Sequence, residues 1–250
     1  MSADQRPLTA VIPCFNEERT IAELLDRVLA SELVGEVIVV DDASTDTTLD
    51  VLAAVDDERV TVLTSAENRG KGAALRRGFA AATLPYVIVQ DADLEYDPAD
   101  YPVMIGPLLD DEADVVYGSR FRGSAAQRVL FFWHAVGNRV LTTASNVTTN
   151  LNLTDMETCY KAFRREIIQS VDLREDRFGF EPEVTAKIAR LDCRIYEVGI
   201  SYHGRTYADG KKIGWRDGFQ ALFCIAAYSR AGERVGAHRL SGLFGRLTGT

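Results

Sequence analysis

Short apolar runs alternate with amphipathic segments along the first half of this chain, and that alternation limits the folds open to it. Runs rich in β-branched residues, such as Val37–Val40 and Tyr86–Val89, predict buried strands. Apolar residues at helical spacing predict helices between these runs. We predict strands over residues 8–13, 36–41, 60–64, 86–90 and 114–118, and helices over residues 20–30, 47–54, 70–82, 101–109 and 133–146. Repeated strand–helix–strand units indicate an α/β fold with a mostly parallel sheet flanked by helices.

Polar residues follow four of the predicted strands, at the point where each strand ends. Ligands of parallel sheets bind beyond these carboxyl ends. The four segments are Pro13–Glu18, Asp41–Asp46, Asn68–Gly72 and Gln90–Asp93. Taken singly, each segment also fits an ordinary helix cap or turn. Four such segments at one edge of a sheet indicate a ligand site.

Asp91 and Asp93 follow a buried strand and stand two residues apart. Two carboxylates at that spacing can reach one small target together, and their oxygens suit a hard divalent cation such as Mg²⁺ or Mn²⁺. A cation held there neutralises a diphosphate leaving group. The alternative interpretation is a pair of loop aspartates, one of which caps a turn or a helix.

Charge and spacing argue against several classes of function. The net charge of -9 argues against a nucleic-acid-binding protein, which would show a basic surface. Gly70 and Gly72 do not have the spacing of a dinucleotide fingerprint or a P-loop. The four cysteines form no Cys-x-x-Cys pair, so neither a zinc site nor a disulfide framework is indicated.

The sequence shows no membrane-targeting pattern. No signal-peptide pattern opens it, and no stretch reaches the ~18 apolar residues of a membrane span. The longest apolar candidate, Phe219–Tyr228, predicts a core or interfacial helix. We therefore expect a cytoplasmic protein.

Together the polar segments resemble family 2 glycosyltransferases of the GT-A fold, which is Rossmann-like, and most resemble the dolichol-phosphate (polyprenyl-phosphate) mannosyltransferase branch. The carriers of the family resemblance are Val11–Glu18, Val40–Asp46, Asn68–Gly72, Gln90–Glu95 and Gly118–Arg120. Thr154–Lys161 and Gly204–Tyr207 resemble the lipid-phosphate branch. The resemblance implies a single GT-A domain over residues 1–250, with a nucleotide-binding half at about 8–118 and a less regular acceptor-side half at about 119–230.

The resemblance also implies roles for individual residues. The implied nucleotide-binding residues are Pro13, Asn16, Glu17, Asp42, Lys71 and Asp91. The implied ligands of Mg²⁺ or Mn²⁺ are Asp91, Asp93 and Glu95, although family members often carry Gln at the last position. The implied catalytic residues are Asp93, Arg120 and Arg205. Arg120 would bind the acceptor phosphate, and Arg205 would bind the donor diphosphate.

The implied reaction is the inverting, metal-dependent transfer of mannose or glucose from GDP-mannose or UDP-glucose to a polyprenyl (dolichyl-type) phosphate. A phosphate acceptor is already anionic at neutral pH, so it needs positioning rather than a strong base. Two alternatives stay open. A soluble transferase with a saccharide or small phosphorylated acceptor would need a general base, for which Asp155, Glu181 and Glu183 are candidates. The other alternative is a non-catalytic sugar-nucleotide-binding module.

A lipid acceptor implies contact with a membrane surface. Four arginines lie around the aromatic run Phe131–Trp133: Arg120, Arg122, Arg128 and Arg139. Cations and aromatic rings both favour the headgroup region of a bilayer. We predict peripheral association with the cytoplasmic membrane face. The alternative is that the aromatic residues belong to the core and the arginines to a solvated rim.

Arg205 lies in a polar, basic segment between Gly204 and Gly210 that continues to Lys211 and Lys212. Glycines at both ends suit a loop that closes over phosphates. We predict a lid at this segment, and the alternative is a solvated basic loop.

Overall fold

A seven-stranded sheet, in the order β3-β2-β1-β4-β6-β5-β7, organises the part of the chain that the computed structural model describes. The described residues are 6–123, 129, 131–204, 215–229 and 231–232. The strands are β1 (Leu8–Cys14), β2 (Val34–Asp41), β3 (Val60–Thr64), β4 (Tyr86–Val89), β5 (Val115–Ser119), β6 (Lys161–Arg164) and β7 (Ile195–Gly199). The helices are α1 (Ile21–Leu29), α2 (Thr48–Ala53), α3 (Lys71–Ala81), α4 (Tyr101–Leu109), α5 (Phe132–Thr149), α6 (Arg165–Ser170), α7 (Phe180–Ile188) and α8 (Trp215–Ala227), and a 3₁₀ helix η2 spans Pro98–Asp100.

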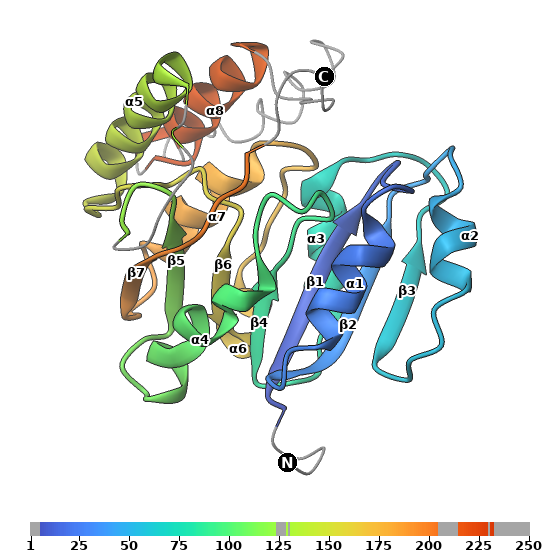
Figure 1. Ribbon diagram of the computed structural model, residues 1–250. Coiled ribbons are helices and arrows are strands. Elements are labelled where there is room, and N and C mark those ends of the chain that lie inside the picture. The colour runs from blue at the N-terminus through green and yellow to red at the C-terminus, as the bar shows by residue number, and fades with distance from the viewer. Residues whose placement is uncertain (1–5, 124–128, 130, 205–214, 230, 233–250) are drawn as a thin grey trace.

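The sheet is mostly parallel, which confirms the predicted fold class. β1 pairs in parallel with β2 and β4, β2 with β3, and β5 with β7. β6 is the exception, because it pairs antiparallel with both β4 and β5. Figure 1 shows helices on both faces of this sheet, as a Rossmann-like GT-A fold requires.

Burial of both sheet faces explains why the predicted strands read as nearly continuous apolar runs. All seven residues of β1 are buried, and two apolar clusters fill the space between the sheet and its helices. α1 turns one stripe toward this core, formed by Ile21, Leu24, Leu25 and Val28, as the helical spacing predicts. β3 and α4 begin and end at the predicted residues, and the other predicted elements shift by one to three residues at an end.

α5 and α8 lie beyond the carboxyl ends of the strands on the β5 side of the sheet (Figure 1). The apolar segment from Phe219 belongs to α8, and it is a half-buried helix: Cys224 and Ile225 face the interior, while Phe219 and Leu222 are exposed. Among the described residues, no helix combines the length and hydropathy that a bilayer crossing demands.

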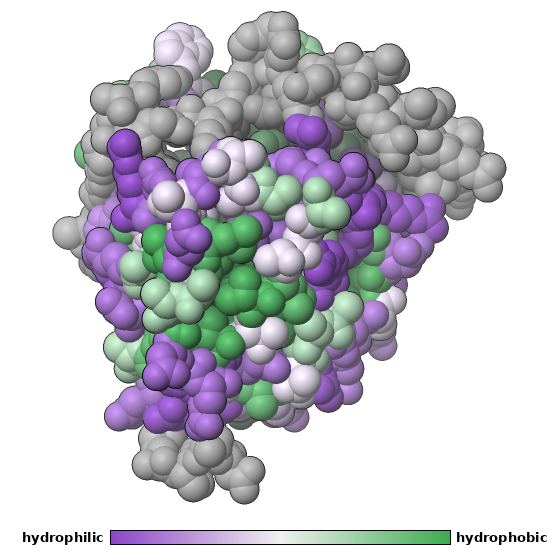
Figure 2. Space-filling model, turned by 90° about the vertical axis from the view of Figure 1, so that its right-hand side faces the viewer, coloured by the Kyte–Doolittle hydropathy of each residue, from purple (hydrophilic) through white to green (hydrophobic). Residues whose placement is uncertain are grey.

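The opposite edge of the sheet carries a second exposed apolar surface. Figure 2 shows apolar side chains gathered on the face that presents α2 and β3. A groove between α1 and α2 contributes to it, with Leu25, Leu29, Val51 and Val55 among its lining residues. Its lining residues come from α1, α2 and the segment after α2, and none of them belongs to the polar loops described next.

Candidate functional site

The loops after β1 and β2 are joined by hydrogen bonds at the carboxyl edge of the sheet. The Asn16 side-chain oxygen accepts from the Thr45 backbone N–H at 2.8 Å, and the Asn16 N–H donates to Ser44 Oγ at 2.9 Å. The Glu17 N–H donates to Thr48 Oγ1 at 3.0 Å. Pro13 is buried within β1, level with Val40 of β2. The structure therefore brings the first two predicted segments together.

Among the described residues, three of the five residues other than glycine that have a positive φ lie in loops at this edge of the sheet. Asn16, Ala43 and Leu94 have φ values of 54°, 61° and 61°, and they lie in the loops after β1, β2 and β4. Such conformations are rare for residues other than glycine and occur often at binding and active sites, where surrounding contacts enforce them. Three of these loops thus have a backbone shape that their own sequences do not favour.

Asp42 organises the turn that leads into α3. Its carboxylate accepts from the backbone N–H groups of Arg69, at 3.0 and 3.1 Å, and Gly70, at 2.5 Å. Gly70 has a φ of 100°, and a Cβ there would lie 2.6 Å from the Asp176 carbonyl oxygen, so the turn requires glycine. A carboxylate offers about four acceptor positions, so Asp42 keeps capacity for a ligand.

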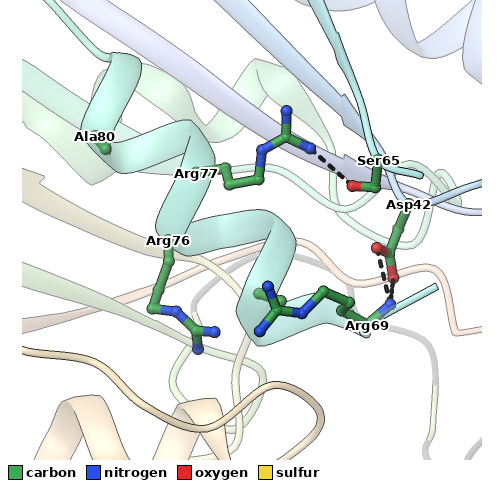
Figure 3. A pocket seen from close by; sticks show the side chains of 7 residues that line it. Asp42, Ser65, Arg69, Arg76, Arg77 and Ala80 are labelled. Carbon is green, nitrogen blue, oxygen red and sulfur yellow. Dashed lines mark hydrogen bonds between the residues drawn. The ribbon is translucent and has the colours of Figure 1, made fainter. Parts of the chain in front are cut away.

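A pocket of about 210 Å³ adjoins Asp42 on the outer side of α3. Its lining residues are Asp42, Ser65, Arg69, Ala73, Arg76, Arg77 and Ala80. Figure 3 shows the side chains of Arg76 and Arg77 projecting from α3 and that of Arg69 from the turn before it, with the Arg77 guanidinium directed at Ser65 Oγ, 2.7 Å away. The pocket beside Asp42 is therefore rich in arginine, although Arg69 and Arg76 both pair with Asp176.

Lys71, the first residue of α3, connects three elements. Its Nζ lies 2.9 Å from Asp91 Oδ1, 3.2 Å from Glu181 Oε1 on α7 and 2.7 Å from Cys159 Sγ. Burial lowers the pKa of Lys71, but the charges of Asp91 and Glu181 outweigh it and raise the pKa well above its ordinary value. Lys71 is thus a fixed cation beside the acidic loop. Glu181, considered above only as a base, belongs to this donor-side cluster.

Gln90 fixes the acidic loop that contains Asp91 and Asp93. Its Nε2 donates to the carbonyls of Asp91, at 3.1 Å, and Tyr96, at 3.3 Å. Its Oε1 accepts from the hydroxyls of Tyr101, at 2.9 Å, and Tyr160, at 2.7 Å. An amide side chain has two donors and two acceptor positions, so this fully buried group uses all of them.

These carboxylates suit a divalent cation shared with a substrate. Asp91, Asp93 and Glu95 supply the oxygen ligands that Mg²⁺ and Mn²⁺ take, and the Glu95 N–H donates to Asp93 Oδ1 at 3.1 Å. The described residues contain no preassembled group of three or more metal-binding side chains. Mg²⁺ is typically held by one or two carboxylates with substrate phosphates and water, so the donor set fits such a shared site.

Arg120 stands after β5 and forms a bidentate ion pair with the buried Asp155. Nε and Nη2 lie 2.7 Å from the two carboxylate oxygens, and the Arg120 backbone N–H donates to Asp155 Oδ2 at 3.0 Å. Nη2 also donates to Asn138 Oδ1 at 3.2 Å. Burial raises the pKa of Asp155, but Arg120 outweighs it and lowers the pKa below its ordinary value. Asp155 is therefore a partner for Arg120 and a poor proton acceptor.

Glu183, another candidate base, has a structural role. Its carboxylate accepts from the backbone N–H groups of Arg174 and Glu175, each at 2.8 Å, and pairs with Lys187 at 2.5 Å. Of the three carboxylates considered as bases, only Glu181 contacts the cluster of Lys71 and Asp91. Arg205, with the predicted lid, and Arg128 lie outside the described residues.

The aromatic run before and within α5 is on the surface. Phe131, Phe132 and Trp133 have exposed fractions of 55%, 69% and 77%. The alternative that these rings belong to the core is therefore wrong. Arg122 and Arg139 are also exposed, whereas Arg120 is mostly buried beside Asp155.

Comparison with known proteins agrees with this geometry. A family model described as glycosyl transferase family 2 matches residues 9–172. An undecaprenyl-phosphate mannosyltransferase from Micrococcus luteus is 30% identical over 216 residues, covering 82% of this chain and 86% of the relative.

Other relatives are longer. The low-salt glycan biosynthesis hexosyltransferase Agl6 of Haloferax volcanii is 29% identical, covering 84% of this chain but 51% of its own length. The undecaprenyl-phosphate 4-deoxy-4-formamido-L-arabinose transferase of Proteus mirabilis is 28% identical, covering 82% of this chain and 62% of its own length. This chain thus spans about half to two thirds of these two relatives.

Among solved structures, glucosyl-3-phosphoglycerate synthase from Mycobacterium tuberculosis, in complex with Mn²⁺, UDP and glucosyl-3-phosphoglycerate, superposes with a TM-score of 0.68. The match covers 90% of this chain and 80% of that chain at 23% identity. The TM-score shows a shared GT-A fold, and at this identity the likeness shows the fold alone.

Proposed function

This chain belongs to glycosyltransferase family 2, and we propose that it transfers a hexose, mannose or glucose, from a nucleotide sugar to a polyprenyl phosphate. The observation that carries the proposal is the Arg120–Asp155 pair. The guanidinium is mostly buried and oriented through Nε and Nη2, and it packs on the ring of Tyr202, whose hydroxyl bonds to Glu95 of the loop after β4. The names of the undecaprenyl-phosphate relatives support the lipid acceptor.

On the donor side, residues of the nucleotide-binding half, about 8–118, surround the nucleotide sugar. Asp42 accepts hydrogen bonds from the base or ribose, and the loop residues Asn16 and Glu17 lie beside it. Asp91 and Asp93, with Glu95, would hold Mg²⁺ or Mn²⁺, which would supply charge neutralisation for the diphosphate. Lys71 adds a fixed positive charge beside Asp91. Arg205 contributes a further cation to the diphosphate.

On the acceptor side, in residues of about 119–230, Arg120 positions the phosphate. A guanidinium has five N–H donors. Within the described part of the chain, its side-chain hydrogen bonds leave from Nε and Nη2, and we infer that the two Nη1 hydrogens donate to the acceptor phosphate. A phosphate oxygen attacks the anomeric carbon as its bond to the diphosphate oxygen breaks, which inverts that carbon. No proton leaves the anionic acceptor, so no general base is needed.

The exposed rings of Phe131, Phe132 and Trp133 support peripheral docking on the cytoplasmic face of a membrane. Aromatic side chains favour the headgroup region, where the phosphate of a polyprenyl phosphate lies. Replacing Phe132 and Trp133 by Ser should abolish sedimentation with anionic vesicles. Leu109→Ser, an exposed apolar residue at the end of α4, is the matched control. Unchanged sedimentation of the double variant would remove this surface from the proposal.

The acceptor assignment is tested with two variants and two lipids. Arg120→Ala should raise the KM for polyprenyl phosphate by roughly tenfold or more, because it removes a charged hydrogen bond. Arg27→Ala, an exposed arginine on α1, should leave it unchanged. Polyprenol, which lacks the phosphate, should not accept sugar. Equal KM values for both variants would contradict the role of Arg120.

A second candidate is transfer to a water-soluble hydroxyl acceptor, and the position of Glu181 favours it. That carboxylate lies at the donor-side cluster, 3.2 Å from Lys71 Nζ, where a base for a hydroxyl nucleophile would be placed. Transfer to a saccharide or small phosphorylated acceptor, with none to a lipid phosphate, would establish this candidate. The absence of both transfer and nucleotide-sugar hydrolysis would establish a non-catalytic binding module.

A further inference from the structure

Tyr202 lies just beyond β7 and contacts both sides of the candidate site. Its hydroxyl donates to Glu95 Oε2 at 2.7 Å. The Arg120 guanidinium packs on the face of the Tyr202 ring, and its Cζ lies 5.3 Å from the ring centroid. With 8% of its surface exposed, Tyr202 is a buried side chain that connects the acidic loop to the arginine after β5.

The backbone on each side of Tyr202 is also fixed. The His203 N–H donates to the Glu95 carbonyl at 2.8 Å, so two adjacent residues bond to Glu95. The Ser201 N–H donates to Asp100 Oδ2 at 2.6 Å. The ring of Tyr96 packs against that of Tyr202, with centroids 5.3 Å apart and planes inclined by 58°. These contacts leave the Tyr202 ring little freedom to turn.

The chemistry of each contact suits a positioning role. The Tyr202 hydroxyl donates its hydrogen bond to the Glu95 carboxylate, which can only accept. The face of a tyrosine ring attracts a guanidinium, more strongly where water is excluded. One side chain therefore orients an anion on the donor side and a cation on the acceptor side.

We propose that Tyr202 is a positioning residue that holds Glu95 and Arg120 in one fixed arrangement, so that the metal-binding loop and the acceptor phosphate are aligned. This inference rests on the proposed function. The hydroxyl sets the orientation of the Glu95 carboxylate, and the ring sets the orientation of Arg120. The two contributions are separable, because Tyr202→Phe removes the hydroxyl and keeps the ring, whereas Tyr202→Leu removes both.

The test measures binding without turnover. Mn²⁺ is titrated by calorimetry into the wild type, Tyr202→Phe and Tyr202→Leu at saturating UDP, and again at saturating GDP. Farnesyl phosphate, a short prenyl phosphate, is titrated separately. The control is Tyr196→Phe, a tyrosine of β7 with an exposed fraction of 42%. Thermal unfolding of every variant shows whether a change in binding reflects a loss of folded protein.

We expect Tyr202→Phe to bind Mn²⁺ about tenfold more weakly, as when an outer partner of a metal ligand is removed. Its affinity for farnesyl phosphate should stay at the wild-type value. Tyr202→Leu should bind both ligands more weakly than the wild type, with its affinity for farnesyl phosphate reduced about fivefold or more. Under turnover, Tyr202→Phe should raise the metal requirement and leave the acceptor KM unchanged, a separation that general destabilisation would not produce.

Mn²⁺ affinity of Tyr202→Phe equal to that of Tyr196→Phe overturns the inference and leaves the proposed function standing. If the wild type fails to bind Mn²⁺ at saturating UDP and also at saturating GDP, both the inference and the proposed function are overturned. A wild type that binds Mn²⁺ but no farnesyl phosphate overturns the acceptor assignment, and with it the Arg120 half of the inference. Equal losses of both ligands in Tyr202→Phe would overturn the separation of the two contacts.

Discussion

Replacing Gln90 by Met tests how the acidic loop is held. Met has a similar length and no hydrogen-bonding amide, so the variant fills the space and removes all four hydrogen bonds. Two carbonyls, of Asp91 and Tyr96, and two hydroxyls, of Tyr101 and Tyr160, lose their partner. At about 1 kcal/mol for each bond, the free energy of unfolding should fall by about 4 kcal/mol.

The effect on ligand binding should exceed that of destabilisation alone. Without Gln90, the backbone between Asp91 and Tyr96 loses the amide that joins its two ends. The affinity for Mn²⁺ at saturating nucleotide should therefore fall by about tenfold or more, as for other outer-shell changes. Urea unfolding gives the free energy, and calorimetry under conditions where the variant is fully folded gives the affinity.

Gln169→Met is the matched control. The Gln169 side chain donates to the carbonyls of Phe79, at 2.7 Å, and Ala82, at 3.0 Å, and contacts none of the site loops. Gln169→Met should lower the free energy of unfolding by at most about 2 kcal/mol and leave the Mn²⁺ affinity unchanged. A Gln90→Met protein that binds Mn²⁺ as tightly as Gln169→Met would refute the reasoning, whatever its stability.

Further predictions concern the donor site, acid stability and backbone strain. Asp42→Ala should raise the donor KM roughly tenfold or more, by loss of a charged hydrogen bond; unchanged KM and nucleotide affinity would remove Asp42 from the site. Asp93→Ala should abolish transfer while its circular dichroism spectrum stays unchanged. Turnover by the wild-type protein that is undiminished in EDTA would contradict a metal role. The pKa of Asp155 is lowered in the folded protein, so its pairing with Arg120 stabilises the fold above the unfolded pKa of about 3.9 and that stabilisation is lost as pH falls through the folded value. In urea unfolding, the free energy of unfolding of Asp155→Asn should therefore fall less than that of the wild type as pH drops from about 5 to 3. Equal falls in the two proteins would contradict the ion pair. Ala43→Gly should stabilise the protein by about 1 kcal/mol, because glycine accepts the φ of 61°, and a destabilised variant would show that the strain is absent.

The first half of the fold was predictable because its information is local. α1 shows its buried stripe in its own spacing, and β3 is bounded by the residues that the pattern indicates. β6 was not predicted, since Lys161–Arg164 is short and begins and ends with a cation. The Lys161 side chain is buried all the same, because its Nζ donates to the carbonyls of Met156, at 3.0 Å, and Thr158. Only the folded chain reveals that these acceptors are in reach.

The candidate site divides in the same way. The Asp-x-Asp triplet and Arg120 stand out in the sequence because charged residues follow apolar strands. Gln90 stands beside the triplet, but its tyrosine partners lie 11 and 70 residues further along the chain. The sequence indicates Asp155 only as a candidate base. Its pairing with Arg120 could not be predicted, because that pairing depends on the turn after β5. Long-range pairings of this kind have no local periodicity.

Transfer of labelled sugar into lipid tests the central claim most directly. The protein is incubated with radiolabelled GDP-mannose or UDP-glucose, polyprenyl phosphate in detergent and Mn²⁺, and label is counted in the organic phase. We predict organic-phase label that depends on protein, on metal and on the lipid phosphate, with one of the two donors. Label that appears only in a water-soluble acceptor, or that reaches the lipid equally well in EDTA, would contradict the account.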